Sequence, residues 1–287
     1  MSHQHAHAAH EHGHHDDSEA ALTELLDLEG EVLHSYLDDL TSWIAAMAEP
    51  PVARIIDLGS GTGTGTLALL HRFPGAHVTA VDLAPERLAR LTHRAAELGC
   101  AEQLGTVKAD LDQPWPDLGP ADLVWSSMAL HHVADPGQTL TKILGLLRPG
   151  GSLVIAETDP RAAFPRFLPE GAGAGVEARV HELLARLLAE QVPEMGADWA
   201  TRLTAAGFTV TAERVFEVVL APPLPPATGR YAQLSLDRLR TGLAGQLTPA
   251  DRTALATLVA DDGPDSLCHR DDLTVRATRL AWLARRP

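Results

Sequence analysis

Residues 54–65 read RIIDLGSGTGTG, a short apolar strand pattern that runs directly into a glycine-rich turn. Because glycine has no Cβ atom, such a turn between a buried strand and a helix lets a ligand touch the backbone. Nicotinamide-binding turns share this general pattern. Their G-x-G-x-x-G spacing would require glycine where this chain has Thr64, so the stretch favours a different ligand.

Short apolar strands and amphipathic helical stretches alternate around this turn. Helical patterns at 65–72, 85–98 and 138–147 separate the first strands, and a short helix at 200–206 precedes the last two. Alternation at this pitch predicts an α/β fold with a parallel sheet and right-handed crossover connections. The predicted strands are 53–58, 77–83, 105–109, 123–127, 152–157, 208–220 and 274–285.

Further helical segments flank and interrupt this core. Between residues 19 and 47 apolar side chains recur at three- and four-residue steps, which predicts two amphipathic helices, or one with a break near Gly30. Two insertions contain helical patterns of their own and could form a lid. The predicted organisation is a disordered His-rich tail at 1–18, a helical cap at 19–49, and an α/β domain at 50–287 with insertions at about 161–196 and 222–272.

An acidic side chain stands at the end of each of the first three strands. Asp82, 25 residues after Asp57, can accept hydrogen bonds from both hydroxyls of a ribose. Asp110, at the third strand, is not part of the nicotinamide pattern. Each acid also has an ordinary explanation, because Asp57 could cap the next helix and Asp110 could be a turn residue.

Taken together in order and spacing, five stretches resemble the class I S-adenosylmethionine (SAM)-dependent methyltransferases of small molecules. They are residues 55–63, Asp82, Asp110, LVWSSMALHHV at 123–133 and LRPGG at 147–151. The resemblance covers about residues 50–160 and the strands near 200–220 and 273–285. It implies a Rossmann-like, mostly parallel sheet of seven strands with helices on both faces, an antiparallel last strand, N-terminal helices and an inserted helical lid.

The resemblance also implies a role for individual residues around SAM. Asp57 and the turn would hold the methionyl part, Asp82 would accept from the ribose hydroxyls, and Asp110 would accept from the adenine amino group. The turn residues in this assignment are Gly59, Ser60, Gly61 and Gly63, and the residues beside the adenine are Leu83 and Leu111.

Three further residues are expected to border the cofactor. Ser126 and Ser127, at the tip of the fourth strand, would line the methionyl end and face the substrate. Arg87 could stack on the adenine as a cation over a π face, although an exposed helix arginine explains it equally well. The turn at 148–151 is expected to close a helix before the fifth strand.

Methyl transfer from a sulfonium is an in-line displacement, so positioning the acceptor supplies most of the catalysis. A general base is needed where the acceptor carries a proton, and His131, His132 and Glu157 are the candidates, with Asp159 comparable. The two histidines could instead serve the loop. Tyr36 could reach over the cofactor, although core packing explains it as well.

Composition restricts the partners. The formal net charge is −15, from 38 acidic against 23 basic residues, which disfavours a nucleic-acid substrate. The two cysteines form no disulfide framework, and the chain shows neither a signal peptide nor a membrane span. We expect a soluble cytoplasmic protein with a small-molecule substrate and no nucleic-acid or membrane partner. The oligomeric state stays open, a homodimer being one option.

Seven of the fifteen histidines lie in the first 17 residues: His3, His5, His7, His10, His12, His14 and His15. At this density they could bind Zn²⁺, Ni²⁺ or Cu²⁺, or simply form a solvated arm, and no catalytic metal is predicted. Methyl transfer to O, N or C of a small molecule is the favoured function. The alternatives are a cyclisation or decarboxylation by a SAM-binding enzyme of this fold, and a non-catalytic SAM- or metal-binding protein.

Overall fold

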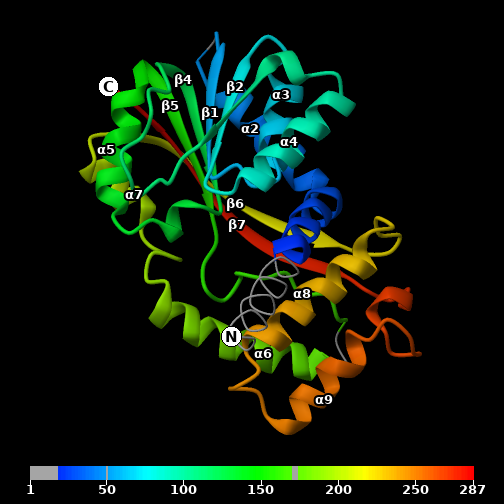
Figure 1. The fold of residues 1–287 in the computed structure, drawn as a ribbon. Helices are drawn as coiled ribbons and strands as arrows, with labels where there is room; N and C mark the ends of the chain where they lie inside the picture. The colour runs from blue at the N-terminus through cyan, green and yellow to red at the C-terminus, as the bar shows by residue number, and fades with distance from the viewer. Residues whose placement is uncertain (1–18, 50, 170–173) are drawn as a thin grey trace, which may run out of the picture.

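The computed structural model describes residues 19–49, 51–169 and 174–287, and a seven-stranded sheet forms its centre (Figure 1). The strand order is β3-β2-β1-β4-β5-β7-β6. The first five strands pair in parallel, whereas β7 runs antiparallel to both β5 and β6. This arrangement confirms the predicted Rossmann-like sheet and its antiparallel last strand. The strands are β1 (Arg54–Leu58), β2 (His77–Asp82), β3 (Leu104–Lys108), β4 (Ala121–Ser127), β5 (Leu147–Glu157), β6 (Thr209–Leu220) and β7 (Val275–Arg285).

Helices cover both faces of the sheet because successive strand residues point to opposite sides. Ile55 of β1 belongs to an apolar cluster with α2 (His34–Met47) and α3 (Thr64–Arg72), while its neighbour Ile56 packs with α5 (Pro136–Leu146) and α7 (Trp199–Ala205). On the first of these faces α4 (Pro85–Glu97) covers β2 through Leu88 and Leu91. The buried strands, apolar on both sides, are typical of a parallel sheet between two helical layers.

The N-terminal helical region is interrupted near Gly30, as predicted, but not at the glycine itself. Residues 19–32 are helical, Leu33 is a turn, and α2 follows directly, so the region forms two helices and the interruption lies close to Gly30, at Leu33. Gly30 serves close packing instead, because a Cβ atom there would lie 2.4 Å from the Thr64 side chain. The glycine therefore lets helix 19–32 approach the first turn of α3.

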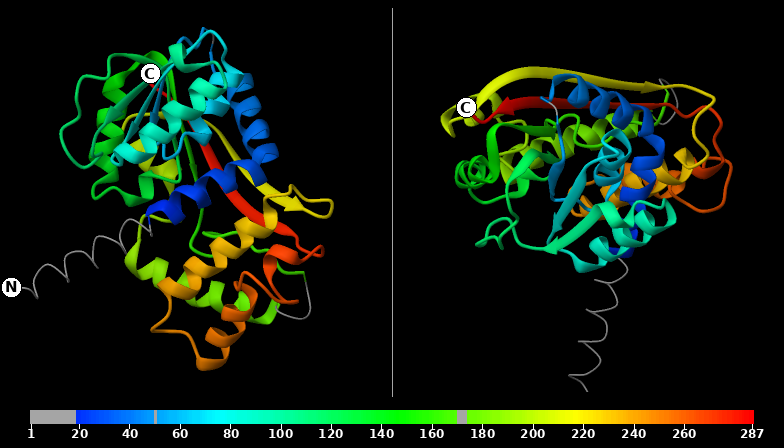
Figure 2. Two further views of the ribbon diagram at one scale, coloured as in Figure 1. Left: turned by 45° about the vertical axis from the view of Figure 1, so that its right-hand side comes forward. Right: turned by 90° about the horizontal axis from the view of Figure 1, so that it is seen from above.

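The two insertions are helical and pack against each other beyond the carboxyl ends of the parallel strands (Figures 1 and 2). They contribute α6 (Ala174–Gln191), α8 (Thr228–Gly242) and α9 (Pro249–Leu258). Arg179 of α6 is paired with Asp251 of α9 at 2.5 Å, and Arg230 of α8 with Glu24 of helix 19–32 at 2.7 Å. The insertions thus form one helical layer that reaches the N-terminal helix.

The segment at 148–151 differs from its expectation as a turn before the fifth strand. Strand β5 already begins at Leu147, which pairs with Ala121, and the pairing with β4 becomes irregular before Leu123 meets Ser152. Gly150 has a φ of +78°, a backbone conformation that glycine adopts readily. A local irregularity inside the strand therefore replaces the turn.

Within residues 19–49, 51–169 and 174–287, none of the helices combines the length and apolar character that crossing a bilayer requires. The predicted tail at 1–18 and its seven histidines lie outside the described residues. In the part of the chain that is described, no three His, Cys, Asp or Glu side chains are grouped as metal ligands.

Candidate functional site

A cavity of about 540 Å³ opens at the carboxyl ends of β1, β2 and β4, where open α/β sheets generally bind their ligands. Its floor is the glycine-rich turn with Asp57, Asp82 and Asp110. Helix 19–32 and α2 form the opposite wall, and α8 and β7 contribute one arginine each. Residues from the N-terminal cap, the sheet and an insertion therefore enclose one space.

The glycine-rich turn folds tightly over the end of β2. The amides of Gly59 and Ser60 both donate to the carbonyl of Val81, and the amide of Gly61 donates to Asp82 Oδ2 at 2.8 Å. Gly59 and Gly61 both have positive φ, but they differ in how close other side chains lie to them. A Cβ atom on Gly59 would lie 2.4 Å from Ala129, whereas one on Gly61 would meet only Leu26, at 3.6 Å, and would face the cavity.

Gly61→Ala is therefore expected to weaken ligand binding more than it weakens the fold. The φ of +54° costs an alanine about 1–2 kcal/mol of stability, and the added methyl group occupies space that a ligand needs. We expect S-adenosylhomocysteine affinity to fall by about tenfold, measured by calorimetric titration. Gly99→Ala is the matched control, because Gly99 also has positive φ, has open space around it and lies away from the cavity. Equal affinity in both variants would contradict the expectation.

Asp82 and Asp110 both line the cavity. Asp82 Oδ1 accepts from the amide of Ala84 at 2.9 Å while Oδ2 accepts from Gly61, so the carboxylate is held between two backbone donors. Asp110 Oδ1 accepts from the amide of Asp112 at 2.9 Å. Arg87 also lines the cavity, but it pairs with Glu19 at 2.8 Å and lies 3.9 Å from Asp82 Oδ1.

Asp57 lines the cavity from a fully buried position at the end of β1. Its Oδ2 accepts from the Thr66 hydroxyl at 2.5 Å. Burial and, to a smaller extent, the nearby Asp82 raise the pKa of Asp57 to about 7, against the lowering effect of the Thr66 hydrogen bond. An ionised Asp57 is therefore costly in the free protein and suits a cationic ligand group.

Asp57→Asn is expected to stabilise the free protein above neutral pH while weakening ligand binding. The pKa of Asp57 rises on folding from 3.8 to about 7, so the folded state holds a proton that the unfolded state releases. The contribution to stability is present below pH 4 and is lost as pH rises through 7. Urea unfolding should show a gain of about 2–4 kcal/mol for the variant at pH 8, and little difference at pH 4. A variant less stable than wild type at pH 8 would contradict this.

Two residues predicted to contact the cofactor lie outside the cavity wall. Ser126 is fully buried, and its hydroxyl donates to the carbonyl of Leu58 at 2.9 Å, so it does not face the cavity. Gly63 makes room for Leu91, which would lie 2.1 Å from an added Cβ atom. Gly59, Ser60, Gly61, Leu83, Leu111 and Ser127 do line the cavity.

Of the three predicted catalytic residues, one lines the cavity and two do not. Glu157 and His131 are buried, and neither lines the cavity. Glu157 Oε2 lies 2.5 Å from His131 Nδ1, and Oε1 accepts from the amide of Leu130 at 3.0 Å. His132 does line the cavity, with its ring centroid 4.0 Å from that of His131. Partial burial lowers the pKa of His132 to about 4, with a smaller effect of His131, so its ring is neutral at pH 7.

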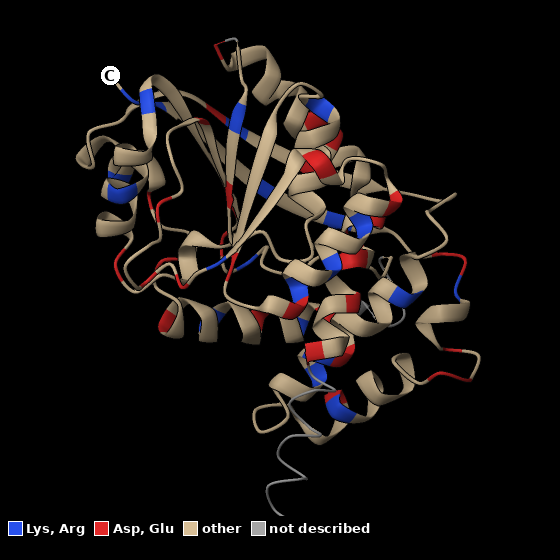
Figure 3. Ribbon diagram, turned by 45° about the horizontal axis from the view of Figure 1, so that its top comes forward, with Lys and Arg blue, Asp and Glu red and all other residues tan. Residues whose placement is uncertain are grey.

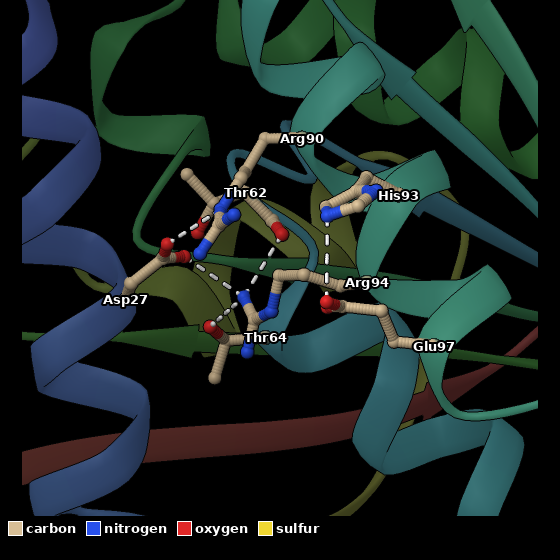
Figure 4. Close-up of polar contacts among 7 residues, drawn as sticks. All are labelled: Asp27, Thr62, Thr64, Arg90, His93, Arg94 and Glu97. Carbon is tan, nitrogen blue, oxygen red and sulfur yellow. Dashed lines mark hydrogen bonds and ion pairs between the residues drawn. The ribbon is translucent and has the colours of Figure 1, made fainter.

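Sequence reasoning missed how helix 19–32 is attached to the floor of the site (Figure 4). Asp27 accepts from Arg90 Nε and from Arg94 Nη1, both at 2.9 Å. The same nitrogen of Arg94 donates to the carbonyl of Thr62 at 3.0 Å and lies 3.3 Å from the Thr64 hydroxyl oxygen. Asp27 and Arg94 therefore link the N-terminal helix to the glycine-rich turn. No local sequence signal indicates such a long-range contact.

Met128 is a second residue without a readable sequence signal. It lines the cavity just after β4 and has a φ of +55°, which is rare for a residue other than glycine. Its amide donates to the carbonyl of Ala156 at 2.8 Å, so pairing with the end of β5 holds the strained conformation. Strain of this kind is concentrated at functional sites.

Three observations fit this cavity to an adenosyl ligand with a cationic tail. The Ser60 hydroxyl is buried and has no hydrogen-bond partner among the described residues, so a ligand could satisfy it. Leu83 lines the cavity yet is 59% exposed, and an apolar ring would cover it. The three strand-end acids supply acceptors for hydroxyl and amino groups.

Comparison with known proteins agrees with this fit. The family described as a methyltransferase domain matches residues 56–155. A trans-aconitate 2-methyltransferase of Mycobacterium sp. (strain KMS) is 30% identical over 69% of this chain and 79% of its own length. A malonyl-[acyl-carrier protein] O-methyltransferase of Laribacter hongkongensis is 34% identical over 58% and 54%. The chain thus spans about half the length of several curated relatives that it matches.

Solved structures share the fold at low sequence identity. A protein of Bacillus halodurans C-125 superposes with a TM-score of 0.54 and 17% identity over 86% of this chain and 98% of its own. The YcgJ protein of Bacillus subtilis gives 0.53 and 15% over 88% and 98%. With the trans-aconitate relative covered over more than two thirds of its length, the chain belongs to the class I SAM-dependent methyltransferases.

Proposed function

We propose that this chain transfers the methyl group of SAM to a small molecule that binds in the same cavity. The observation that carries the proposal is the row of Asp57, Asp82 and Asp110 at the ends of β1, β2 and β3, facing one cavity beside the glycine-rich turn. SAM supplies a methyl group on a sulfonium, which makes it ready for displacement. The residues of the chain hold and orient the two reactants.

The strand-end residues hold the cofactor. Asp82 accepts hydrogen bonds from the ribose hydroxyls, and Asp110 accepts from the adenine amino group. Leu83 and Leu111 pack beside the adenine. Asp57 pairs with the cationic amino group of the methionyl part, which favours the ionised carboxylate that burial alone disfavours.

The remaining predicted residues have separate roles in this proposal. Ser60, Gly61 and Ser127 line the methionyl end, and Arg87 closes the outer side through Glu19 rather than stacking freely. Of His131, His132 and Glu157, only His132 lines the cavity, so it is the residue that would take a proton from an acceptor that loses one, although its lowered pKa makes it a weak base. Glu157 and His131 position the loop that carries it.

A small acceptor fits this site better than a macromolecule. Helix 19–32 and α2 wall the cavity on the side away from the sheet, and α8 adds Arg238. Acidic and basic positions are interspersed along the helices (Figure 3), and the net charge is −15, which opposes a phosphate backbone.

The function is tested by incubating the protein with SAM and candidate acceptors and measuring the masses of the products by mass spectrometry. Methyl transfer makes a product heavier than its acceptor by one CH₂ unit, together with S-adenosylhomocysteine. A rearranged product of unchanged mass, or loss of CO₂, would instead support a cyclisation or a decarboxylation.

Removing residues 1–17 should leave turnover unchanged, because the proposed reaction gives the histidine-rich segment no part.

A further inference from the structure

The sheet order places opposite charges at the two ends of the cavity. The acids stand at the ends of β3, β2 and β1, whereas Arg279 lies on β7, beyond β4 and β5. Neighbouring strands are about 4.8 Å apart, so β1 and β7 are separated by about 14 Å. Leu280 pairs with Glu157, the last residue of β5, which puts Arg279 at the carboxyl edge of the sheet.

Arg279 is a buried cation with more N–H donors than recorded hydrogen-bond partners. Only 2% of the residue is exposed, and its side chain pairs with Glu29 at 2.8 Å and donates to the carbonyl of Thr278 at 3.1 Å. Burial lowers the pKa of Arg279, while the negative charge of Glu29 raises it, and the pKa stays above its ordinary value. The guanidinium has five N–H groups, so its recorded partners leave some for a ligand.

Arg238 adds a second positive charge from the insertion. It lies on α8, is exposed, and lines the same cavity as Arg279. Among the described residues it has neither an ion-pair nor a hydrogen-bond partner. The nearby Arg240 differs, because it pairs with Asp237 at 2.6 Å and does not line the cavity.

Tyr36 contributes an unpartnered hydroxyl to this end of the site. The residue is 7% exposed and lines the cavity, and its buried hydroxyl has no hydrogen-bond partner in the described part of the chain. Burial raises the pKa of Tyr36, so the hydroxyl keeps its proton and can donate. Leaving such a group unsatisfied costs about 1–3 kcal/mol, which a ligand oxygen would recover.

Building on the proposed function, we propose that the methyl acceptor carries an anionic group, a carboxylate or a phosphate, which Arg238, Arg279 and Tyr36 bind at the β7 end of the cavity. All three side chains donate hydrogen bonds. The carboxylate of Glu29 neutralises only one of the two arginines. An oxyanion satisfies a guanidinium in two parallel hydrogen bonds, whereas a cationic acceptor would be repelled by Arg238.

The test uses the full chain saturated with S-adenosylhomocysteine and three probes of similar shape: benzoate, phenyl phosphate and neutral benzamide. Calorimetric titration should give at least about tenfold tighter binding for one of the anions than for benzamide, because hydrogen bonds to charged groups contribute about 1.5–3 kcal/mol. The tighter of the two anions identifies the group. Arg238→Gln should remove most of this preference, while Arg240→Gln keeps it.

Two further variants separate an anion site from a structural ion pair. Glu29→Gln should tighten anion binding, because Arg279 loses a competing carboxylate, and Tyr36→Phe should weaken it several-fold. Benzamide binding as tightly as both anions, or an unchanged preference in Arg238→Gln, would overturn the inference while S-adenosylhomocysteine binding leaves the proposed function intact. Failure of wild-type protein to bind S-adenosylhomocysteine would remove the proposed function, and this inference with it.

Discussion

Asp82→Ala is expected to weaken S-adenosylhomocysteine binding by about a hundredfold or more. The carboxylate is the proposed acceptor for two ribose hydroxyls, and each hydrogen bond to a charged group contributes about 1.5–3 kcal/mol. The substitution also releases the amides of Gly61 and Ala84 from the turn that forms the cavity floor. Calorimetric titration of the variant against wild type measures the loss.

Asp122→Ala is the matched control for this substitution. Asp122 Oδ2 also accepts from two backbone amides, those of Ala53 and Arg54, but at the opposite end of β1 and outside the cavity. Both variants lose two such hydrogen bonds and one contact with an arginine, Arg148 at 2.7 Å for Asp122 and Arg87 at 3.9 Å for Asp82, so their stabilities in urea should fall by similar amounts. Only Asp82→Ala should lose affinity. A comparable loss of affinity in both variants would mean that Asp82 acts through the fold alone.

Glu157→Ala is expected to lower the free energy of unfolding by about 3 kcal/mol or more. The substitution leaves the buried His131 ring and the buried amide of Leu130 without their acceptor, and breaking a buried pair costs about 3–5 kcal/mol. Urea unfolding measures this loss. Turnover should fall as well, since the loop that carries His132 and Met128 loses one of its two attachments to β5, the other being the hydrogen bond from Met128 to Ala156.

Two comparisons distinguish this positioning role from a catalytic one. Glu157→Gln keeps an acceptor oxygen, so it should recover part of the stability and of the turnover. Glu97→Ala, at an exposed position on α4, should change stability by less than about 0.5 kcal/mol. Unchanged stability of Glu157→Ala, with turnover abolished and the pH profile altered, would instead make Glu157 the general base.

The strands, the sheet order and the three acids could be predicted because their signals are local. Apolar runs that end in Asp57, Asp82 and Asp110 give the strand ends, and parallel pairing brings those ends to one edge. The choice between Ser126 and Ser127 depends on strand alternation: one hydroxyl turns back to Leu58 while its neighbour reaches the cavity. A family resemblance that names both positions does not make that distinction.

The rest of the site depends on contacts between distant segments. Gly30 resembles a helix breaker in sequence, but its role is set by Thr64, which no local pattern connects to it. Glu157 resembles an available base at a strand end until packing buries it against His131. Arg238 stands in a helix of the second insertion, and only the folded chain brings it to the cavity. Sequence therefore predicts the cofactor floor better than the acceptor wall.

Calorimetric titration of the wild-type protein with S-adenosylhomocysteine tests the central claim most directly. The cavity residues Asp57, Asp82, Asp110 and Ser60 predict one binding site per chain, with a dissociation constant on the order of micromolar. Saturable binding at that stoichiometry is the expected result. Absence of binding to protein shown to be folded by circular dichroism would contradict the account, because the strand-end acids would then hold no adenosyl cofactor.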